Sequence, residues 1–143
     1  METIKEPIVV FWLCMLLHLI ADYTMQGVLA SLKQRKWWSE ELKKLAYSTK
    51  EPKTPEEQEL IFSHYRYDYL AGLACHAMMW SIMMCLPLLL VCTPSAFSAA
   101  VVTNTVVHMV VDDLKANLCC INLWQDQLLH IAQITVTVGI LAY

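Results

Sequence analysis

The chain has 143 residues, an ordinary length for one domain, but 57% of them are hydrophobic and only 16% are charged. This composition excludes an ordinary water-soluble domain and is typical of an integral membrane protein. The net charge of −3 comes without a dense basic patch on a soluble surface, so we expect no nucleic-acid partner.

Four apolar segments are long enough to cross a bilayer, whose core of about 30 Å requires about 20 helical residues. They cover approximately residues 8–29, 69–91, 95–114 and 123–142. Helices are expected because each helix satisfies its own backbone hydrogen bonds in lipid. The sequence therefore predicts an all-α integral membrane protein, a four-transmembrane-helix bundle that forms one domain over residues 1–143.

The connection between the first two spans, residues 30–68, holds eight of the ten Lys and Arg residues. The positive-inside rule places this connection in the cytoplasm and both chain termini outside (N-out/C-out). Within it, Trp38, Leu42 and Leu45 share one helical face, which predicts an amphipathic helix lying at the cytoplasmic lipid headgroups. A solvated charged loop is the alternative interpretation.

Capping signals mark where several helices begin. Thr54, followed by Pro55 and Glu57, forms a capping-box pattern, and we expect its helix to run on into the second span. Thr93 precedes a proline and Asn122 precedes the fourth span, so both are candidate N-caps.

Three of the predicted spans carry polar residues three or four positions apart, which places them on one face of each helix. These stripes are His18, Asp22 and Gln26 in the first span, Asn104, His108 and Asp112 in the third, and Asn122, Asp126, His130 and Gln133 in the fourth. The second span contributes one histidine, His76. In the predicted topology all four groups fall in the cytoplasmic half of the bilayer, so we expect them to meet in the centre of the bundle.

Ionisable side chains inside a span cost several kcal/mol unless they are paired, hydrated or bound to a metal. Imidazole nitrogens and carboxylate oxygens are suitable ligands for divalent ions, and bundle cores are established places for such sites. The sequence therefore predicts a metal site with the ligands His18, Asp22, His76, His108, Asp112, Asp126 and His130. So many ligands fit two ions better than one, with zinc favoured over manganese or iron. Gln26, Asn104 and Gln127 are expected to orient the ligands through hydrogen bonds.

A metal-free network is the alternative for the same residues. In that case the His and Asp side chains hydrogen-bond to one another and hold the helices together, or they relay protons. Asp113 points away from the His108 face and is expected to be peripheral.

A family resemblance rests on four features in a fixed order: HLIADYTMQ, a histidine early in the second span, HMVVDDLK and DQLLH. In these motifs the chain resembles a group of small bacterial and phage membrane proteins, catalogued as domain-of-unknown-function family 3307. The resemblance covers the four spans and implies a bacterial inner-membrane location. It points to the seven predicted ligands together with Gln26, Gln127 and Lys115. The family has no assigned activity; more distantly it is similar to inner-membrane proteins regarded as candidate metal-dependent hydrolases.

Three functions are compatible with this pattern. The leading hypothesis is a metal-dependent hydrolase acting on a lipid or phosphoester at the cytoplasmic interface, with Asp126 or Asp22 as general base and Lys115 holding a phosphate. A metal-ion or proton transporter is the second, although the outer halves of the spans are apolar. The third is a non-catalytic module that recruits a partner through its basic amphipathic loop. The lipid bilayer is the expected partner in each case, and the oligomeric state is left open.

Overall fold

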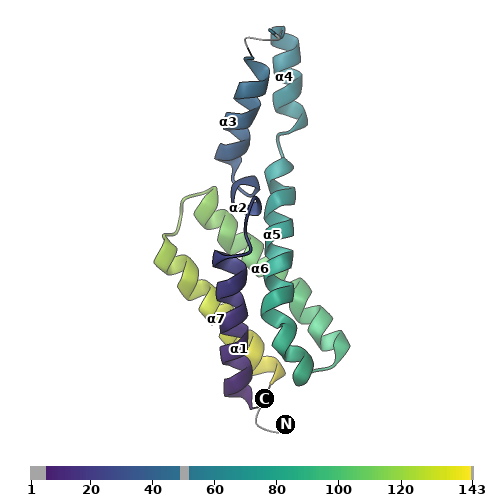
Figure 1. Cartoon of the computed structure of the whole chain (residues 1–143), viewed down its shortest axis with the longest axis vertical. Helices are drawn as coiled ribbons and strands as arrows, with labels where there is room; N and C mark the ends of the chain where they lie inside the picture. The colour runs from purple at the N-terminus through teal and green to yellow at the C-terminus, as the bar shows by residue number, and fades with distance from the viewer. Residues whose placement is uncertain (1–5, 49–51, 143) are drawn as a thin grey trace.

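The computed structural model of the chain describes residues 6–48 and 52–142, and every regular element in these ranges is helical. Four helices form a bundle, and two further helices form a hairpin that extends from one end of it along the long axis (Figure 1). In chain order the elements are α1 (Pro7–Tyr23), α2 (Leu29–Leu32), α3 (Arg35–Ala46), α4 (Pro55–His64), α5 (Asp68–Cys85), η2 (Leu86–Leu90), α6 (Pro94–Ala116) and α7 (Leu123–Leu141).

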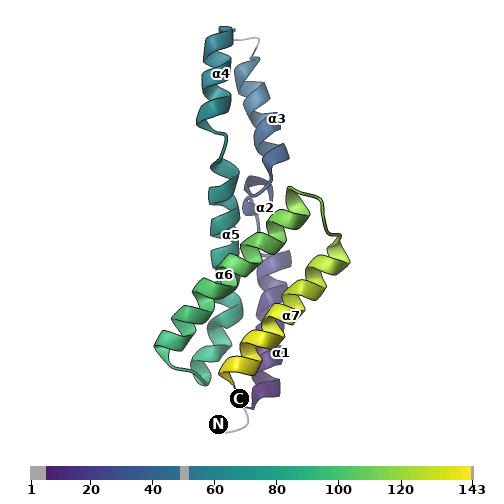
Figure 2. The ribbon, with the colours of Figure 1, turned by 180° about the vertical axis from the view of Figure 1, so that it is seen from behind.

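The bundle consists of α1, α5, α6 and α7. Helix α5 packs against α1 and α6, and α7 packs against α6 and α1, which closes the ring. Seen from behind, α6 crosses α5 obliquely and α7 lies over α1 (Figure 2). Helix α1 begins and α7 ends at the end of the bundle opposite the hairpin, so the two ends of the bundle differ.

Among the described residues, two helical segments are long and apolar enough to cross a membrane: Pro55–Leu90, with 36 residues, and α6, with 23. Helix α1 is apolar but shorter, with 17 residues. The expectation of an all-helical fold is thus confirmed, together with two candidate spans.

The capping signals are confirmed at all three helix starts. The Thr54 hydroxyl accepts a hydrogen bond from the Glu57 backbone N–H, and Asn122 forms a capping box with Gln125. Thr93 accepts from the backbone N–H of Ala96 at the start of α6. These side chains satisfy backbone donors that the first helical turn leaves without a partner.

Helix α1 ends at Tyr23, earlier than the predicted first span, which extends to about residue 29. Thr24 caps α1, and beyond it Gly27, whose φ of 48° is left-handed, turns the chain away from the helix direction. The chain then forms the short α2 and leads into α3. This turn brings the start of the basic connection back against the bundle.

Helix α3 forms where the amphipathic pattern predicts a helix, but it does not lie across the end of the bundle. It runs beside α4 along the long axis (Figure 1). Part of its apolar face packs against α4: Leu42 and Ala46 are buried, and the Tyr47 and Phe62 rings lie 6.3 Å apart, whereas Leu45 remains 48% exposed. The predicted helix is therefore present, and its placement at the headgroups stays a prediction. Residues 49–51, part of the predicted insert, lie outside the described residues.

The apolar core fills the half of the bundle away from the hairpin. Its buried members include Val10, Cys14, Met84, Leu88 and Ile134, contributed by α1, α5, η2 and α7. The polar stripes occupy the other half, nearer the hairpin.

Candidate metal centre

The seven predicted metal ligands meet in the bundle, and each side chain is at most 9% exposed. They are His18 and Asp22 from α1, His76 from α5, His108 and Asp112 from α6, and Asp126 and His130 from α7. Helical spacing places the pairs from α1, α6 and α7 on inward faces, and the ring of helices brings those faces together. We call these seven residues the His/Asp cluster.

One group of ligand atoms within the cluster is centred on His76. Its Nε2 lies 3.3 Å from His108 Nε2, 3.2 Å from Asp112 Oδ2 and 3.7 Å from Asp22 Oδ1. His108 Nε2 and Asp112 Oδ2 are 3.7 Å apart. Tetrahedral ligands at about 2.0–2.2 Å from a zinc ion are separated by roughly 3.3–3.6 Å. Ligand atoms of Asp22, His76 and His108 all lie within 4.8 Å of one another, a spacing that one ion could use, and Asp112 Oδ2 lies next to both imidazoles.

A second group is centred on His130. Its Nε2 lies 3.3 Å from Asp126 Oδ1 and 3.7 Å from Asp112 Oδ1. The carboxylate of Asp112 thus turns Oδ2 towards His76 and Oδ1 towards His130, between the two groups. Side-chain atoms of His108, Asp112 and His130 also lie within 4.8 Å of one another. A carboxylate that faces two groups of ligand atoms in this way could contribute one oxygen to each of two ions if both were bound.

Several buried atoms of the cluster have no hydrogen-bond partner among the described residues. They include both ring nitrogens of His130, Oδ1 of Asp126, and Nδ1 of His76 and of His108. A buried polar atom without a partner costs about 1–3 kcal/mol, so a cluster that served only to hold helices together should satisfy its members. His130 Nε2 and Asp126 Oδ1 face each other at 3.3 Å, an ion pair if the imidazole is protonated and a spacing that a metal ion between them could use.

Lys33 enters the cluster from outside the predicted spans. Its side chain is buried, and Nζ lies 2.6 Å from Asp112 Oδ2. Sequence reasoning counted Lys33 only as one of the basic residues of the connection. No local pattern marks it out, because its position depends on the turn after α1 and on contacts with α5 and α6.

Contacts on both sides fix the backbone at Lys33. A Cβ at Gly72 of α5 would lie 2.6 Å from the carbonyl carbon and oxygen of Leu32, so only glycine permits this approach. From α6, Asn117 donates through Nδ2 to the Lys33 carbonyl and accepts through Oδ1 from the Arg35 N–H. These contacts hold the α2–α3 turn where the lysine can reach Asp112.

Lys115, the predicted phosphate-holding residue, pairs with a carboxylate of the cluster. Its Nζ lies 2.5 Å from Asp126 Oδ2, and its side chain remains 34% exposed. Lys115 therefore sits at the rim, with access to the surroundings. Asp113 lies on another face of α6, as expected, where it accepts a hydrogen bond from Asn117 Nδ2.

His18 is buried beside the cluster but lies outside both groups of converging ligand atoms. Trp80 donates through Nε1 to His18 Nδ1 at 2.8 Å. The accepting Nδ1 leaves the hydrogen on Nε2, which then donates to Gln127 Oε1 at 3.2 Å. Trp80, which the sequence analysis did not single out, also stacks on His108 with ring centroids 4.1 Å apart.

Two of the three amides expected to orient ligands do contact them. Gln26 donates to Asp22 Oδ1 at 3.0 Å, and Gln127 donates to Asp22 Oδ2 and to Asp126 Oδ2 at 3.2 and 3.1 Å. Asn104 does not: its amide bonds instead with Gln133 and Thr137, further along the bundle. The reason is that the facing stretch of α7 offers amide and hydroxyl partners at that level.

Comparisons of the chain with protein-family models, with curated proteins and with solved structures find no match. The resemblance to family 3307 therefore stays a prediction, and the function has to be argued from the site.

Proposed function

We propose that the protein is a four-span membrane protein that holds divalent metal in its His/Asp cluster and hydrolyses a lipid or phosphoester bond at the cytoplasmic membrane interface. The observation that carries the proposal is the convergence of His76, His108, Asp112 and His130 on shared positions with buried atoms left unsatisfied. Hydrolytic activity is proposed in addition to metal binding, because a divalent ion held by such ligands can activate a water molecule.

The membrane location is supported by where the apolar residues lie. Helix α6 meets the hydropathy of a span, yet only 22% of its most apolar window is buried inside the protein. Large apolar side chains are exposed on all four bundle helices, among them Trp12, Met78, Val102 and Ile140. A water-soluble bundle would turn these faces inwards, whereas lipid accommodates them. We infer that α1 and α7 also cross the bilayer, with the basic hairpin in the cytoplasm.

The charges of the cluster favour a divalent cation. Three carboxylates (Asp22, Asp112 and Asp126) face two lysines (Lys33 and Lys115), which leaves one net negative charge when the histidines are neutral. One divalent ion would reverse that sign to one net positive charge. A second ion would leave the site strongly positive, so we expect two ions only together with an anionic substrate such as a phosphate ester.

A bound divalent ion would lower the pKa of a water molecule and polarise an ester oxygen. With a single ion held at Asp22, His76 and His108, Asp126 would be better suited than Asp22 to act as general base. Its Oδ1 then stays free of ligation and receives no hydrogen bond, whereas both Asp22 oxygens accept from glutamines. The partly exposed Lys115 lies next to Asp126 and is placed to pair with an incoming phosphate.

Elemental analysis of the purified full-length protein tests the metal. We expect a near-stoichiometric divalent metal in the wild type and its loss in His108→Ala. Asn104→Ala is the matched control, because Asn104 lies one turn away on the same face of α6 and bonds to Thr137 and Gln133. A wild-type protein that retains no zinc, manganese or iron after loading would remove the proposal.

Hydrolysis needs its own measurement. We expect the metal-loaded protein to cleave a chromogenic phosphodiester, and Lys115→Ala to lower kcat/KM while the metal content stays unchanged. Metal-loaded protein without activity on lipid or phosphodiester substrates would leave a metal-binding protein and contradict the hydrolase.

Transport is less well supported by the arrangement. The half of the bundle beyond the cluster is mainly apolar, with Val10, Cys14, Met84, Leu88 and Ile134 fully buried there. Among the described residues, the uncharged amide network of Asn104, Gln133 and Thr137 is the polar group that follows the cluster between α6 and α7, and it adds no ionisable side chain. A flux of metal ions or protons into liposomes that disappears in Asp112→Asn would favour the transporter instead.

A further inference from the structure

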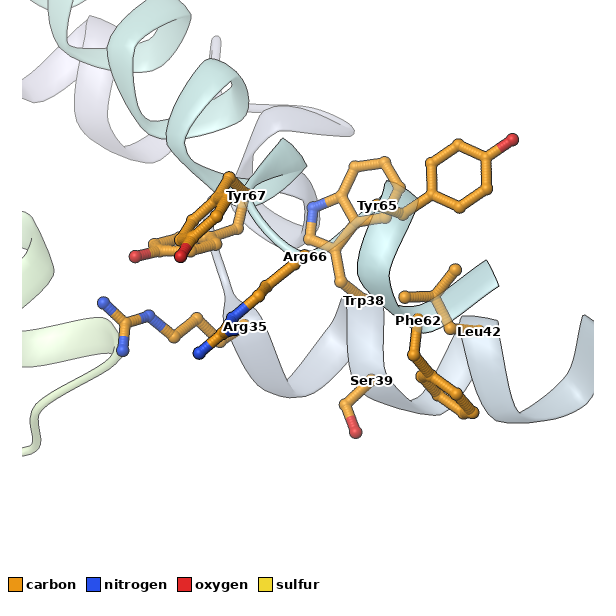
Figure 3. A pocket seen from close by; sticks show the side chains of 9 residues that line it. Arg35, Trp38, Ser39, Leu42, Phe62, Tyr65, Arg66 and Tyr67 are labelled. Atoms are coloured by element: carbon orange, nitrogen blue, oxygen red, sulfur yellow. The ribbon is translucent and has the colours of Figure 1, made fainter. Parts of the chain in front are cut away.

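A pocket of about 290 Å³ lies at the foot of the hairpin, away from the His/Asp cluster. The base of α3 forms one wall, and the turn between α4 and α5 forms the other. Figure 3 shows the side chains of Arg35 and Arg66 entering it from these two walls and extending in the same direction, close to Tyr67. Trp38, Ser39 and Tyr69 complete the polar and aromatic lining.

The two arginines have no acidic partner. Among the described residues, no carboxylate lies within the 4.0 Å of an ion pair from either guanidinium. Each guanidinium instead lies over an aromatic ring: Arg35 Cζ is 4.4 Å from the centroid of Tyr69, and Arg66 Cζ is 5.4 Å from that of Tyr67. A guanidinium that uses its flat face on a ring keeps its N–H edge free for an anion.

Two arginines from opposite walls line one pocket, so an anion placed there would meet positive charge from both. Planar guanidinium groups match phosphate oxygens in a two-point geometry. Acidic residues are available on the hairpin, but Glu41 pairs with Lys44 rather than with Arg35. The pocket therefore offers its positive charge to an external anion.

The position of the pocket indicates where that anion comes from. The pocket lies at the junction where the apolar bundle gives way to the charged hairpin (Figure 1), and Trp37, Trp38, Tyr65, Tyr67 and Tyr69 gather at this level. Tryptophan and tyrosine are enriched at the headgroup level of membranes. We propose that Arg35 and Arg66 bind the phosphate of an anionic lipid headgroup in this pocket. The proposal rests on the proposed membrane location and is independent of the metal and of hydrolysis.

The lipid site also has a structural connection to the cluster. Arg35 follows two residues after Lys33, and Asn117 bonds to the backbone of both. A headgroup held by Arg35 thus lies against the same turn that delivers Lys33 to Asp112. Lipid in the pocket would stabilise that turn and so the position of the lysine.

Native mass spectrometry of the full-length protein in neutral detergent, with added phosphatidylglycerol, tests the proposal. We expect specific binding that falls about tenfold or more in the double variant Arg35→Gln/Arg66→Gln, since hydrogen bonds to charged groups are lost. Lys36→Gln/Lys43→Gln removes the same charge from exposed positions of α3 and should change binding by less than about twofold. Equal losses in both double variants would show general charge attraction and overturn the proposal.

Two further measurements distinguish a lipid headgroup from free phosphate and test a conservative variant that keeps the charge. Inorganic phosphate at the same concentration should not displace the lipid; displacement by free phosphate would overturn the assignment to a headgroup. Arg66→Lys keeps the charge and should bind with intermediate affinity, and unchanged lipid binding by Arg66→Lys would contradict the two-point contact. Metal content should be unaffected in all arginine variants. Lipid binding can therefore be interpreted even if the protein proves to bind no metal.

Discussion

Two polar networks meet one helical turn apart along α6, one between α6 and α7 and the other among all four bundle helices, and they are built differently. The first joins Asn104, Gln133 and Thr137: Asn104 Oδ1 accepts from Gln133 at 2.8 Å and from Thr137 at 3.1 Å, and its Nδ2 donates to Thr137 and to the Ala100 carbonyl. It contains no charge. The second is the His/Asp cluster, which is charged and leaves ring nitrogens and a carboxylate oxygen without partners.

The two networks differ in charge and in hydrogen-bond satisfaction, and these two properties distinguish polar residues that hold helices together from polar residues that bind a ligand. Hydrogen-bonded amides and hydroxyls satisfy most of their valences within the protein, and such contacts contribute about 0.6–2 kcal/mol each between membrane helices. The His/Asp cluster holds three carboxylates and two lysines, which leaves one net negative charge when the histidines are neutral. The amide network leaves one buried atom, Gln133 Oε1, without a hydrogen-bond partner among the described residues, whereas the cluster leaves five and also carries charges. Adhesion between helices is therefore enough to account for the amide network, whereas the cluster favours an external ligand.

Among the variants considered, Asp112→Asn should have the largest effect on the cluster. The change removes the carboxylate between the two groups of ligand atoms and leaves the Lys33 ammonium buried without its counter-ion. We expect loss of bound metal, together with about 3–5 kcal/mol of lost stability. Elemental analysis and unfolding in detergent measure the two effects; retention of full metal content would show that Asp112 is not a ligand.

Lys33→Met removes the ammonium group that competes with a metal ion for Asp112. Without metal the buried Asp112 loses its partner, so we expect a lower Tm than that of the wild type. Added zinc should then raise the Tm more than it does in the wild type, because metal binding no longer has to displace the lysine. Thermal unfolding with and without zinc gives both values, and an equal zinc-dependent increase in both proteins would contradict the competition.

Gly72→Ala tests whether the close contact between Gly72 of α5 and the backbone of Leu32 fixes the position of Lys33. The new methyl group would overlap the backbone of Leu32, which has to move, and we expect about 1–3 kcal/mol of lost stability. Gly139→Ala is the matched control, because a Cβ there meets nothing within 4 Å and helix propensity favours alanine by up to about 1 kcal/mol. Similar unfolding midpoints for the two variants would show that the close approach is unimportant.

Much of the architecture could be predicted from the sequence because it is local. Apolar run lengths indicated the helices, and Thr54, Thr93 and Asn122 marked helix starts by side-chain capping. Helical periodicity predicted which polar residues share a face. These inferences depend on residues within one or two turns of each other, so no knowledge of the tertiary fold was needed.

The parts that could not be predicted depend on contacts between distant segments. Lys33 reaches Asp112 only because Gly27 turns the chain and Gly72 and Asn117 hold it. Trp80 fixes the tautomer of His18 from another helix. The packing of α3 beside α4 was not predicted for the same reason, since an amphipathic face does not reveal which neighbour covers it.

Asn104→Ala is the smallest predicted effect and the one that separates the two networks. In the sequence Asn104 has the same spacing to His108 as His108 has to Asp112, so the pattern alone placed it with the ligands. In the structure its partners belong to the amide network, and the variant removes hydrogen bonds without exposing a charge. We expect about 1–2 kcal/mol of lost stability and an unchanged metal content. If metal were lost as well, the two networks would be coupled, and satisfaction of hydrogen bonds would not be a sufficient criterion for telling adhesion from a site.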